Sequence, residues 1–405
     1  MSPVERGTLS AALGLRNILL AVADVGLSLT TIRVASAYTA KGMQDEAREI
    51  FRRALFTRIV MALMVCALTV AMAPLLAGFP LAIGNRTQVL WAMAAGLAGM
   101  TVAAWGSDVS QACRMFVYYI AHQVGEAVCK LLAVVLVFVV LAGSLLSART
   151  LSVPSESVLW YMAGGATVAG LFSIFIQRRE LARPVALSRE NANRVHGELR
   201  GFNRYGGAIA LLHTVNGAID ILMIQWLIGG GETAIFDGAR RFAQILPLIG
   251  GVLTTVLLPR AAALDSVAAC ARYLKKALGA SLILAVVSAG GLALAAGIII
   301  PLFWGNKYAN SIPALHWLCV AYGLTMLLNP LTVTFYPLKR EGTVVALSAV
   351  NMVLFLALGA RLIPEYGAVG AAYTTIAVKC VLVVLYATLL WPVFRNKGSN
   401  AVHSD

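Results

Sequence analysis

The chain has 405 residues, of which 60% are hydrophobic and only 12% are charged, and its mean hydropathy is +0.81. Soluble domains contain about 25% charged residues, so this composition excludes an ordinary soluble domain and predicts an all-α polytopic membrane protein. The net charge of +14 does not indicate nucleic-acid binding, because the basic residues lie between apolar spans and form no soluble basic domain.

Eleven stretches of the sequence are long and apolar enough to cross a bilayer as helices of about 20 residues. We expect these spans near residues 8–32, 54–78, 88–108, 116–142, 156–176, 205–228, 233–258, 277–300, 312–336, 343–363 and 368–392. The segment from Lys41 to Arg53 mixes charged and apolar side chains, and we interpret it as a helix lying on the cytoplasmic membrane surface.

The longest polar stretch, Gln177 to Arg204, carries seven arginines and separates five predicted spans from six. Lysine and arginine near span ends resist translocation, so we expect this loop and the C-terminus to be cytoplasmic. With that orientation, 21 basic residues lie inside and 5 lie outside, which supports both the topology and the span count. The predicted division is an N-terminal bundle over 1–177, a basic loop over 178–204, a C-terminal bundle over 205–394 and a cytoplasmic tail over 395–405.

Ionisable residues inside the apolar spans are the candidate functional residues. Each costs about 2.5–3.5 kcal/mol at the membrane centre on insertion scales, so each should face a bundle interior or an aqueous cavity. His122, Glu126 and Lys130 share one helical face, and Asp237 lies four residues before Arg241, where the two can pair. We expect the binding of an anionic head group by four cationic residues, Arg16, Lys130, Arg240 and Arg241. We expect ion coupling or charge pairing by four acidic residues, Asp24, Glu126, Asp220 and Asp237. Structural pairing between helices is the alternative for each of them.

No catalytic pattern emerges from the sequence. A paired-carboxylate hydrolase pattern, a nucleophile elbow and a phosphate-binding glycine loop are missing, so we do not expect an enzyme. The six cysteines are scattered without paired spacing, and they imply neither disulfides nor a metal site. No cofactor is implied. For His122, a structural hydrogen bond is favoured over a role in proton relay.

Several segments match, in order and over nearly the whole chain, the motifs of one membrane protein family. They are Leu20 to Gly42, Asp220 to Ile224, Leu227 to Gly229, Leu257 to Arg260, Phe303 to Leu318 with its G-x-x-Y pattern, and Leu362 to Thr375 with its P-x-x-G-x-x-G-A-A pattern. In these segments the chain resembles the polysaccharide flippases of the multidrug/oligosaccharidyl-lipid/polysaccharide exporter superfamily. The resemblance implies two pseudo-symmetric helix bundles around a central cavity. The family-like pattern begins at the second helix, so the first helix is expected to be missing.

The resemblance implies that the protein flips a polyprenyl-diphosphate-linked oligosaccharide across the bacterial cytoplasmic (inner) membrane by alternating access. The product would be a surface polymer such as lipopolysaccharide O-antigen, capsule or exopolysaccharide. Membrane lipids, a polysaccharide polymerase and chain-length proteins are the implied partners, and nucleic acid is not. Three alternatives remain open: a multidrug or cation antiporter of the same superfamily, a peptidoglycan-precursor flippase, and a non-transporting membrane component of a polysaccharide assembly complex.

Overall fold

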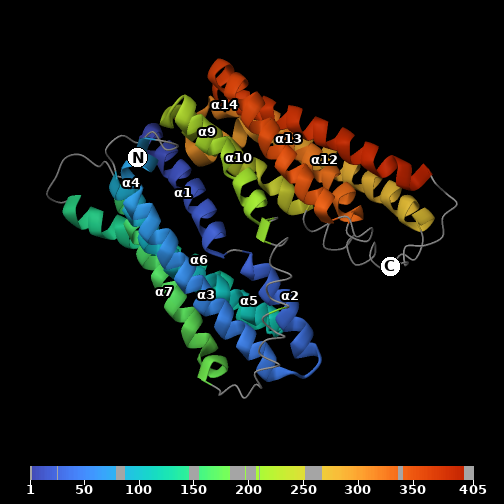
Figure 1. Ribbon diagram of the computed structural model, residues 1–405. Helices are drawn as coiled ribbons and strands as arrows, with labels where there is room; N and C mark the ends of the chain where they lie inside the picture. The colour runs from blue at the N-terminus through green and yellow to red at the C-terminus, as the bar shows by residue number, and fades with distance from the viewer. Residues whose placement is uncertain are drawn as a thin grey trace. The chain divides into compact units, whose positions relative to one another are not determined.

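The computed structural model describes residues 2–24, 26–78, 87–145, 155–182, 197, 207–208, 210–250, 267–335 and 341–395 (Figure 1). The regular structure of these residues is helical throughout, which confirms the predicted all-α class. Most of the basic loop predicted over 178–204 lies outside the described residues, as does the tail after Arg395.

A described helix lies within each predicted membrane span. Six of the described helices are long and apolar enough to cross a membrane, or seven if the bent pair Ala210–Asn216 and Ile219–Leu227 is counted as one span. Helix α14 (Glu341–Arg395) contains the last two predicted spans, because its backbone turns at Gly367, where φ is +62°. Each of the eleven predicted spans therefore contains a described helix, and the chain is a polytopic membrane protein.

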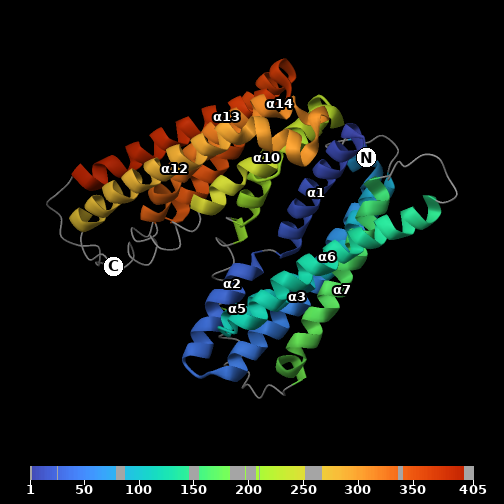
Figure 2. The same cartoon turned by 180° about the vertical axis from the view of Figure 1, so that it is seen from behind.

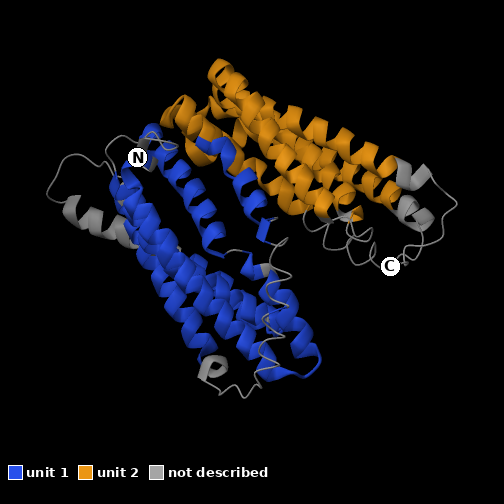
Figure 3. Ribbon diagram, in the orientation of Figure 1, with its two compact units in different colours: residues 1–222 blue, residues 223–405 orange. Residues whose placement is uncertain are grey.

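The chain forms two compact units, Met1–Leu222 and Met223–Asp405 (Figure 3). The boundary lies within α9 (Ile219–Leu227), whereas the sequence-based division was placed in the basic loop. The first unit contains α1 (Pro3–Asp24), α2 (Leu27–Ala40), α3 (Gln44–Ala71), α4 (Ala73–Gly78), α5 (Thr87–Ala112), α6 (Phe116–Leu145) and α7 (Ser155–Ala182). Helix α5 is its central element, because it contacts α1, α2, α3, α6 and α7 (Figures 1 and 2).

Two predicted boundaries in the first unit are wrong. The predicted span 8–32 is divided between α1 and α2, because Gly26 adopts a left-handed conformation with φ +72°. From Gln44 onward, the predicted surface helix over Lys41–Arg53 is the first part of α3, which continues without a break to Ala71. Ile50 and Phe51, which we expected at a membrane surface, are 0% and 3% exposed and belong to the same core cluster as Trp105. The apolar face of this segment is therefore covered by protein.

The second unit contains the end of α9, α10 (Gly230–Ala243), α12 (Val267–Trp304), a 3₁₀ turn (Asn306–Tyr308), α13 (Ser311–Thr334) and α14. Helix α13 packs against α10, α12 and α14. The turn within α14 is fastened to the start of α10, because the backbone N–H of Ala368 donates a 2.8 Å hydrogen bond to Oε2 of Glu232. A side chain at Gly367 would meet that carboxylate, since an added Cβ would lie 2.6 Å from Glu232 Oε2.

Candidate functional site

A polar cavity of about 320 Å³ lies within the first unit, among α1, α2, α5, α6 and the Ala210–Asn216 helix. Its polar lining consists of Asn17, Asp24, Ser28, Thr101, Glu126 and Thr214. Its apolar lining consists of Leu20, Ala21, Met100, Ala104 and Ala210. The structure thus brings together two residues that the sequence had placed on separate helices, Asp24 and Glu126.

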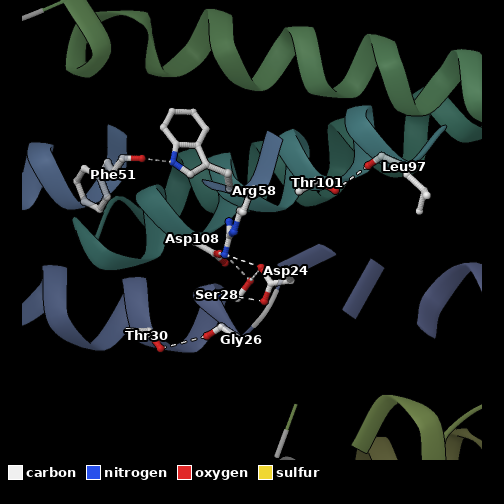
Figure 4. Close-up of polar contacts among 10 residues, drawn as sticks. Asp24, Gly26, Ser28, Thr30, Phe51, Arg58, Leu97, Thr101 and Asp108 are labelled. Atoms are coloured by element: carbon white, nitrogen blue, oxygen red, sulfur yellow. Dashed lines mark hydrogen bonds and ion pairs between the residues drawn. The ribbon is translucent and has the colours of Figure 1, made fainter. Parts of the chain in front are cut away.

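Asp24 is held at the end of α1 by a buried arginine on α3 (Figure 4). The Nη2 atom of Arg58 lies 2.8 Å from Oδ1 of Asp24 and also donates a 2.8 Å hydrogen bond to the hydroxyl of Ser28. The Ser28 backbone N–H and hydroxyl both donate to the Asp24 carboxylate, at 3.2 and 3.1 Å. These contacts fix the carboxylate directly beside the break between α1 and α2 at Gly26.

Asp108 on α5 completes this cluster, because its Oδ2 atom accepts a 2.6 Å hydrogen bond from the same Nη2 atom of Arg58. Arg58 is 0% exposed, so its charge is stabilised by these partners and not by solvent. The candidates chosen from the sequence included neither Arg58 nor Asp108. The signal that could have revealed them is a pair of opposite charges inside the predicted spans 54–78 and 88–108.

Arg16 and Glu126 form a second association of opposite charges in this unit. The two side chains attract each other electrostatically. Glu126 lines the 320 Å³ cavity, whereas Arg16 lines a void of about 10 Å³ that shares Met100 with it. Arg16 therefore lies next to the cavity wall and does not line the cavity itself.

Two further candidates belong to the first unit. Lys130 belongs to α6, but its side chain lies outside the described residues. Asp220 lies in the first turn of α9, where its Oδ1 atom accepts a 2.8 Å hydrogen bond from the N–H of Ile221. It is not among the residues that line the cavity.

The candidates of the second unit lie on α10. Nε of Arg241 is 2.8 Å from Oδ2 of Asp237, so the intrahelical pair predicted from their spacing is present. Asp237 and Arg240 are buried, whereas the Arg241 side chain is 48% exposed. This helix therefore presents one accessible guanidinium beside a buried carboxylate.

His122 makes a hydrogen bond between two helices. Its Nδ1 atom lies 2.9 Å from the Ser173 hydroxyl and joins α6 to α7. Gln177 extends the same contact by donating to the Ser110 hydroxyl at 2.8 Å, which joins α7 to α5. Within the described part of the chain, no group of three His, Cys, Asp or Glu side chains is arranged to hold a metal ion.

The fold is similar to that of several solved membrane transporters. An inward-facing multidrug resistance transporter of the MATE family, in the MOP superfamily, superposes with a TM-score of 0.73 at 13% identity, over 98% of this chain and 93% of that chain. The lipid II flippase MurJ, in an inward closed conformation, gives a TM-score of 0.67 at 12% identity, over 96% and 88% of the two chains. A mutant of the Vibrio cholerae MATE transporter VcmN gives 0.63 at 13% identity, over 97% and 96%. At such low identities these similarities establish the fold.

The sequence comparisons establish the family. No curated protein sequence matches the chain significantly. The profile of a family described as polysaccharide biosynthesis protein matches residues 1–265, which is more than half of the chain. This match and the transporter fold confirm the resemblance inferred from the sequence motifs, and the chain belongs to the polysaccharide biosynthesis protein family.

Proposed function

We propose that this protein flips a polyprenyl-diphosphate-linked oligosaccharide across the bacterial cytoplasmic membrane, by alternating access, for the synthesis of a cell-surface polysaccharide. The observation that carries the proposal is a polar cavity bordered by paired charges inside a membrane-spanning unit of a polysaccharide biosynthesis family member. Buried charge is costly in a membrane protein, and it typically marks a path for polar or ionic cargo. A lipid-linked oligosaccharide needs such a path, because its head group is polar while its tail remains in the bilayer.

The proposed roles follow the sign of each residue's charge. The cationic side chains of Arg16, Lys130, Arg240 and Arg241 receive the diphosphate, because guanidinium and ammonium groups donate charge-assisted hydrogen bonds to phosphate oxygens. The carboxylates of Asp24, Glu126, Asp220 and Asp237 pair with cationic side chains or bind a coupling ion. The exposed guanidinium of Arg241, tethered by Asp237, fits the first role.

Substitution of the α10 arginines tests the proposal. The purified protein would be reconstituted into vesicles containing a fluorescent polyprenyl-diphosphate-linked oligosaccharide, and the lipid reaching the outer leaflet would be measured. We expect Arg240→Gln with Arg241→Gln to slow flipping by at least about tenfold, because two charge-assisted hydrogen bonds of roughly 1.5–3 kcal/mol each are lost.

Arg361→Gln is the matched control, because Arg361 is an exposed arginine of the same unit and lies at the end of the predicted span 343–363. It should flip the lipid at the rate of the wild-type protein. If the two α10 substitutions together left the flipping rate unchanged, the assignment of the diphosphate to Arg240 and Arg241 would be wrong. A wild-type protein that flips no lipid-linked oligosaccharide would contradict the proposed function itself.

A second candidate function is the export of organic cations, and the two carboxylates in the cavity favour it. Asp24 and Glu126 would attract a cationic compound into the first unit. The same vesicles, loaded with ethidium and given a proton or sodium gradient, separate the two functions. Gradient-driven movement of ethidium without flipping of the lipid would identify a cation antiporter.

A further inference from the structure

The cavity of the first unit has an unusual balance of hydrogen-bonding groups. Carboxylates accept hydrogen bonds but donate none when ionised, and a hydroxyl has one proton to donate and two lone pairs that accept. The lining contains the carboxylates of Asp24 and Glu126, the hydroxyls of Ser28, Thr101 and Thr214, and the amide of Asn17. What the cavity can offer a ligand therefore depends on where the three hydroxyl protons already go.

All three hydroxyl protons are already engaged by the protein. Ser28 donates to Oδ1 of Asp24 at 3.1 Å, and Thr101 donates to the carbonyl oxygen of Leu97 at 2.7 Å. Thr214 donates to the carbonyl oxygen of Ala210 at 2.9 Å. The side chains of the lining therefore offer a ligand mainly lone pairs that accept hydrogen bonds. The side-chain N–H donors of the lining belong to the amide of Asn17.

Such a lining discriminates between the two parts of a lipid-linked oligosaccharide. An ionised diphosphate has only acceptors and carries negative charge, so it would meet lone pairs and carboxylates without gaining hydrogen bonds. Asp24 and Glu126 line the cavity, whereas Arg58 and Arg16 do not, so the carboxylates lie nearer to a ligand than these cations do. A sugar is neutral, and each of its hydroxyl groups brings a proton that an acceptor can receive.

The size and the apolar wall of the cavity agree with a ring-sized ligand. Pockets for small molecules begin at about 300 Å³, and liquid water takes about 30 Å³ per molecule. A volume of about 320 Å³ is therefore much larger than a bare monovalent ion requires and matches a sugar ring. Leu20, Met100 and Ala104 provide apolar surface for the C–H face of such a ring.

We infer that this cavity is a sugar subsite, which binds hydroxyl groups of the oligosaccharide and excludes the diphosphate to which the sugars are attached. The inference rests on the proposed function, since it assigns one part of the proposed substrate to one part of the protein. Asp24 accepts sugar hydroxyls while Arg58, with Asp108 as its second partner, holds the Asp24 carboxylate in place. Thr101, Thr214 and Glu126 are the further acceptors.

Two lipid probes test this inference. The affinity of the purified protein would be measured for two lipids. One is polyprenyl diphosphate carrying a disaccharide, and the other is bare polyprenyl diphosphate. We expect Thr101→Val with Thr214→Val to weaken binding of the sugar-bearing lipid by about tenfold, because two hydrogen bonds to the ligand are lost. Affinity for the bare lipid should change by less than about twofold, because a neutral threonine contributes little to it.

The matched control is Thr69→Val on α3. Thr69 is buried like Thr101 and also donates to the carbonyl four residues earlier, at 2.7 Å, but it does not line the cavity. It should leave the affinity for both lipids unchanged. A melting temperature measured for every variant shows whether a loss of affinity reflects a loss of fold.

The possible outcomes separate this inference from the proposed function. Equal weakening for both lipids would place the diphosphate in the cavity and overturn the inference, although flipping by the wild-type protein would continue to support the proposed function. A changed sodium dependence with an unchanged preference for the sugar-bearing lipid would identify a cation site and also overturn it. Wild-type protein that neither binds nor flips the two lipids would overturn the proposed function, and the subsite with it.

Discussion

At the scale of single residues, Arg58 partly neutralises the negative charge of the cluster that it forms with Asp24 and Asp108 in the first unit. Its Nη2 atom contacts both Asp24 and Asp108, whereas Nε and Nη1 have no hydrogen-bond partner among the described residues. One guanidinium nitrogen thus bridges two carboxylates. Without it, the buried carboxylate of Asp108 and the partly buried carboxylate of Asp24 would lie close together uncompensated, which is unfavourable.

We expect Arg58→Met to lower the free energy of unfolding by about 3–5 kcal/mol, because removing one partner of a buried ion pair leaves uncompensated charge. Unfolding in mixed detergent micelles, followed by circular dichroism, measures this loss. The double variant Arg58→Met with Asp108→Asn should recover part of the stability, since it removes one of the two stranded carboxylates.

An ion pair on the same helix provides the control. Arg48 lies 2.9 Å from Asp45 in a partly exposed pair, with side chains 14% and 42% exposed, and exposed pairs contribute about 0–1 kcal/mol. Arg48→Gln should therefore change the stability only slightly. If Arg58→Met lowered the free energy of unfolding no more than Arg48→Gln does, the ion pairs of Arg58 would not stabilise the fold.

The sequence identified Asp24 and Glu126 as candidates because an ionisable residue in an apolar span requires a polar surrounding. It did not identify their partners. Helical periodicity places a residue on a face of its own helix, but it carries no information about which other helix that face meets. Arg58 and Asp108 lie near the ends of their predicted spans, where a charged side chain can reach water without a buried partner. Only the packing of α3 against α5 distinguishes these two situations.

At the scale of helices, close contact between α5 and α7 organises the first unit. Gly99 on α5 meets the backbone of α7, because an added Cβ would lie 2.6 Å from both the carbonyl oxygen of Ala166 and the Cα of Thr167. The contact is reciprocal, since a Cβ on Gly170 would lie 2.7 Å from the carbonyl oxygen of Gly99. Small residues at such a crossing allow two membrane helices to approach closely and gain dispersion energy.

We expect Gly99→Ala to destabilise the protein by about 1–3 kcal/mol, because the methyl group forces the two backbones apart. Thermal unfolding in detergent measures this effect. Gly164→Ala on α7 is the control, because nothing lies within 4 Å of its added Cβ. That substitution should be neutral or stabilise by roughly 0.5–1 kcal/mol, as alanine favours a helix interior over glycine. The same stability change for both variants would argue against a close crossing at Gly99.

The sequence located the helices better than their interruptions. Hydropathy is averaged over a window of many residues, so it does not detect a helix break at a single residue. The left-handed residue Gly26 makes such a break within a predicted span. The charged segment before Ala54 was misassigned for a related reason, because an amphipathic face packs equally well on protein and on lipid headgroups. The turn at Gly367 lies in the gap between the predicted spans 343–363 and 368–392 and within the P-x-x-G-x-x-G-A-A motif, whose glycine adopts the required positive φ.

At the scale of the whole molecule, the asymmetry of basic residues determines the predicted topology. It organised eleven predicted spans into a consistent up-and-down path, and each of these spans contains a described helix. The boundary between the units did not follow from the same signal. Charge bias reports which side of the membrane a loop occupies, whereas a compact unit is defined by side-chain packing, and α9 lies on that boundary.

The predicted orientation can be tested with two exposed positions, Lys41 and Asn306, which seven predicted spans separate. In a background with the six cysteines replaced by alanine, a membrane-impermeant maleimide should label Asn306→Cys in intact cells and Lys41→Cys only after permeabilisation. The reason is that Lys41 belongs to the basic side of the chain and Asn306 to the opposite side. Labelling of both in permeabilised cells shows that each cysteine is reactive. The reverse pattern in intact cells would invert the orientation, and labelling of both there would refute the odd number of spans between them.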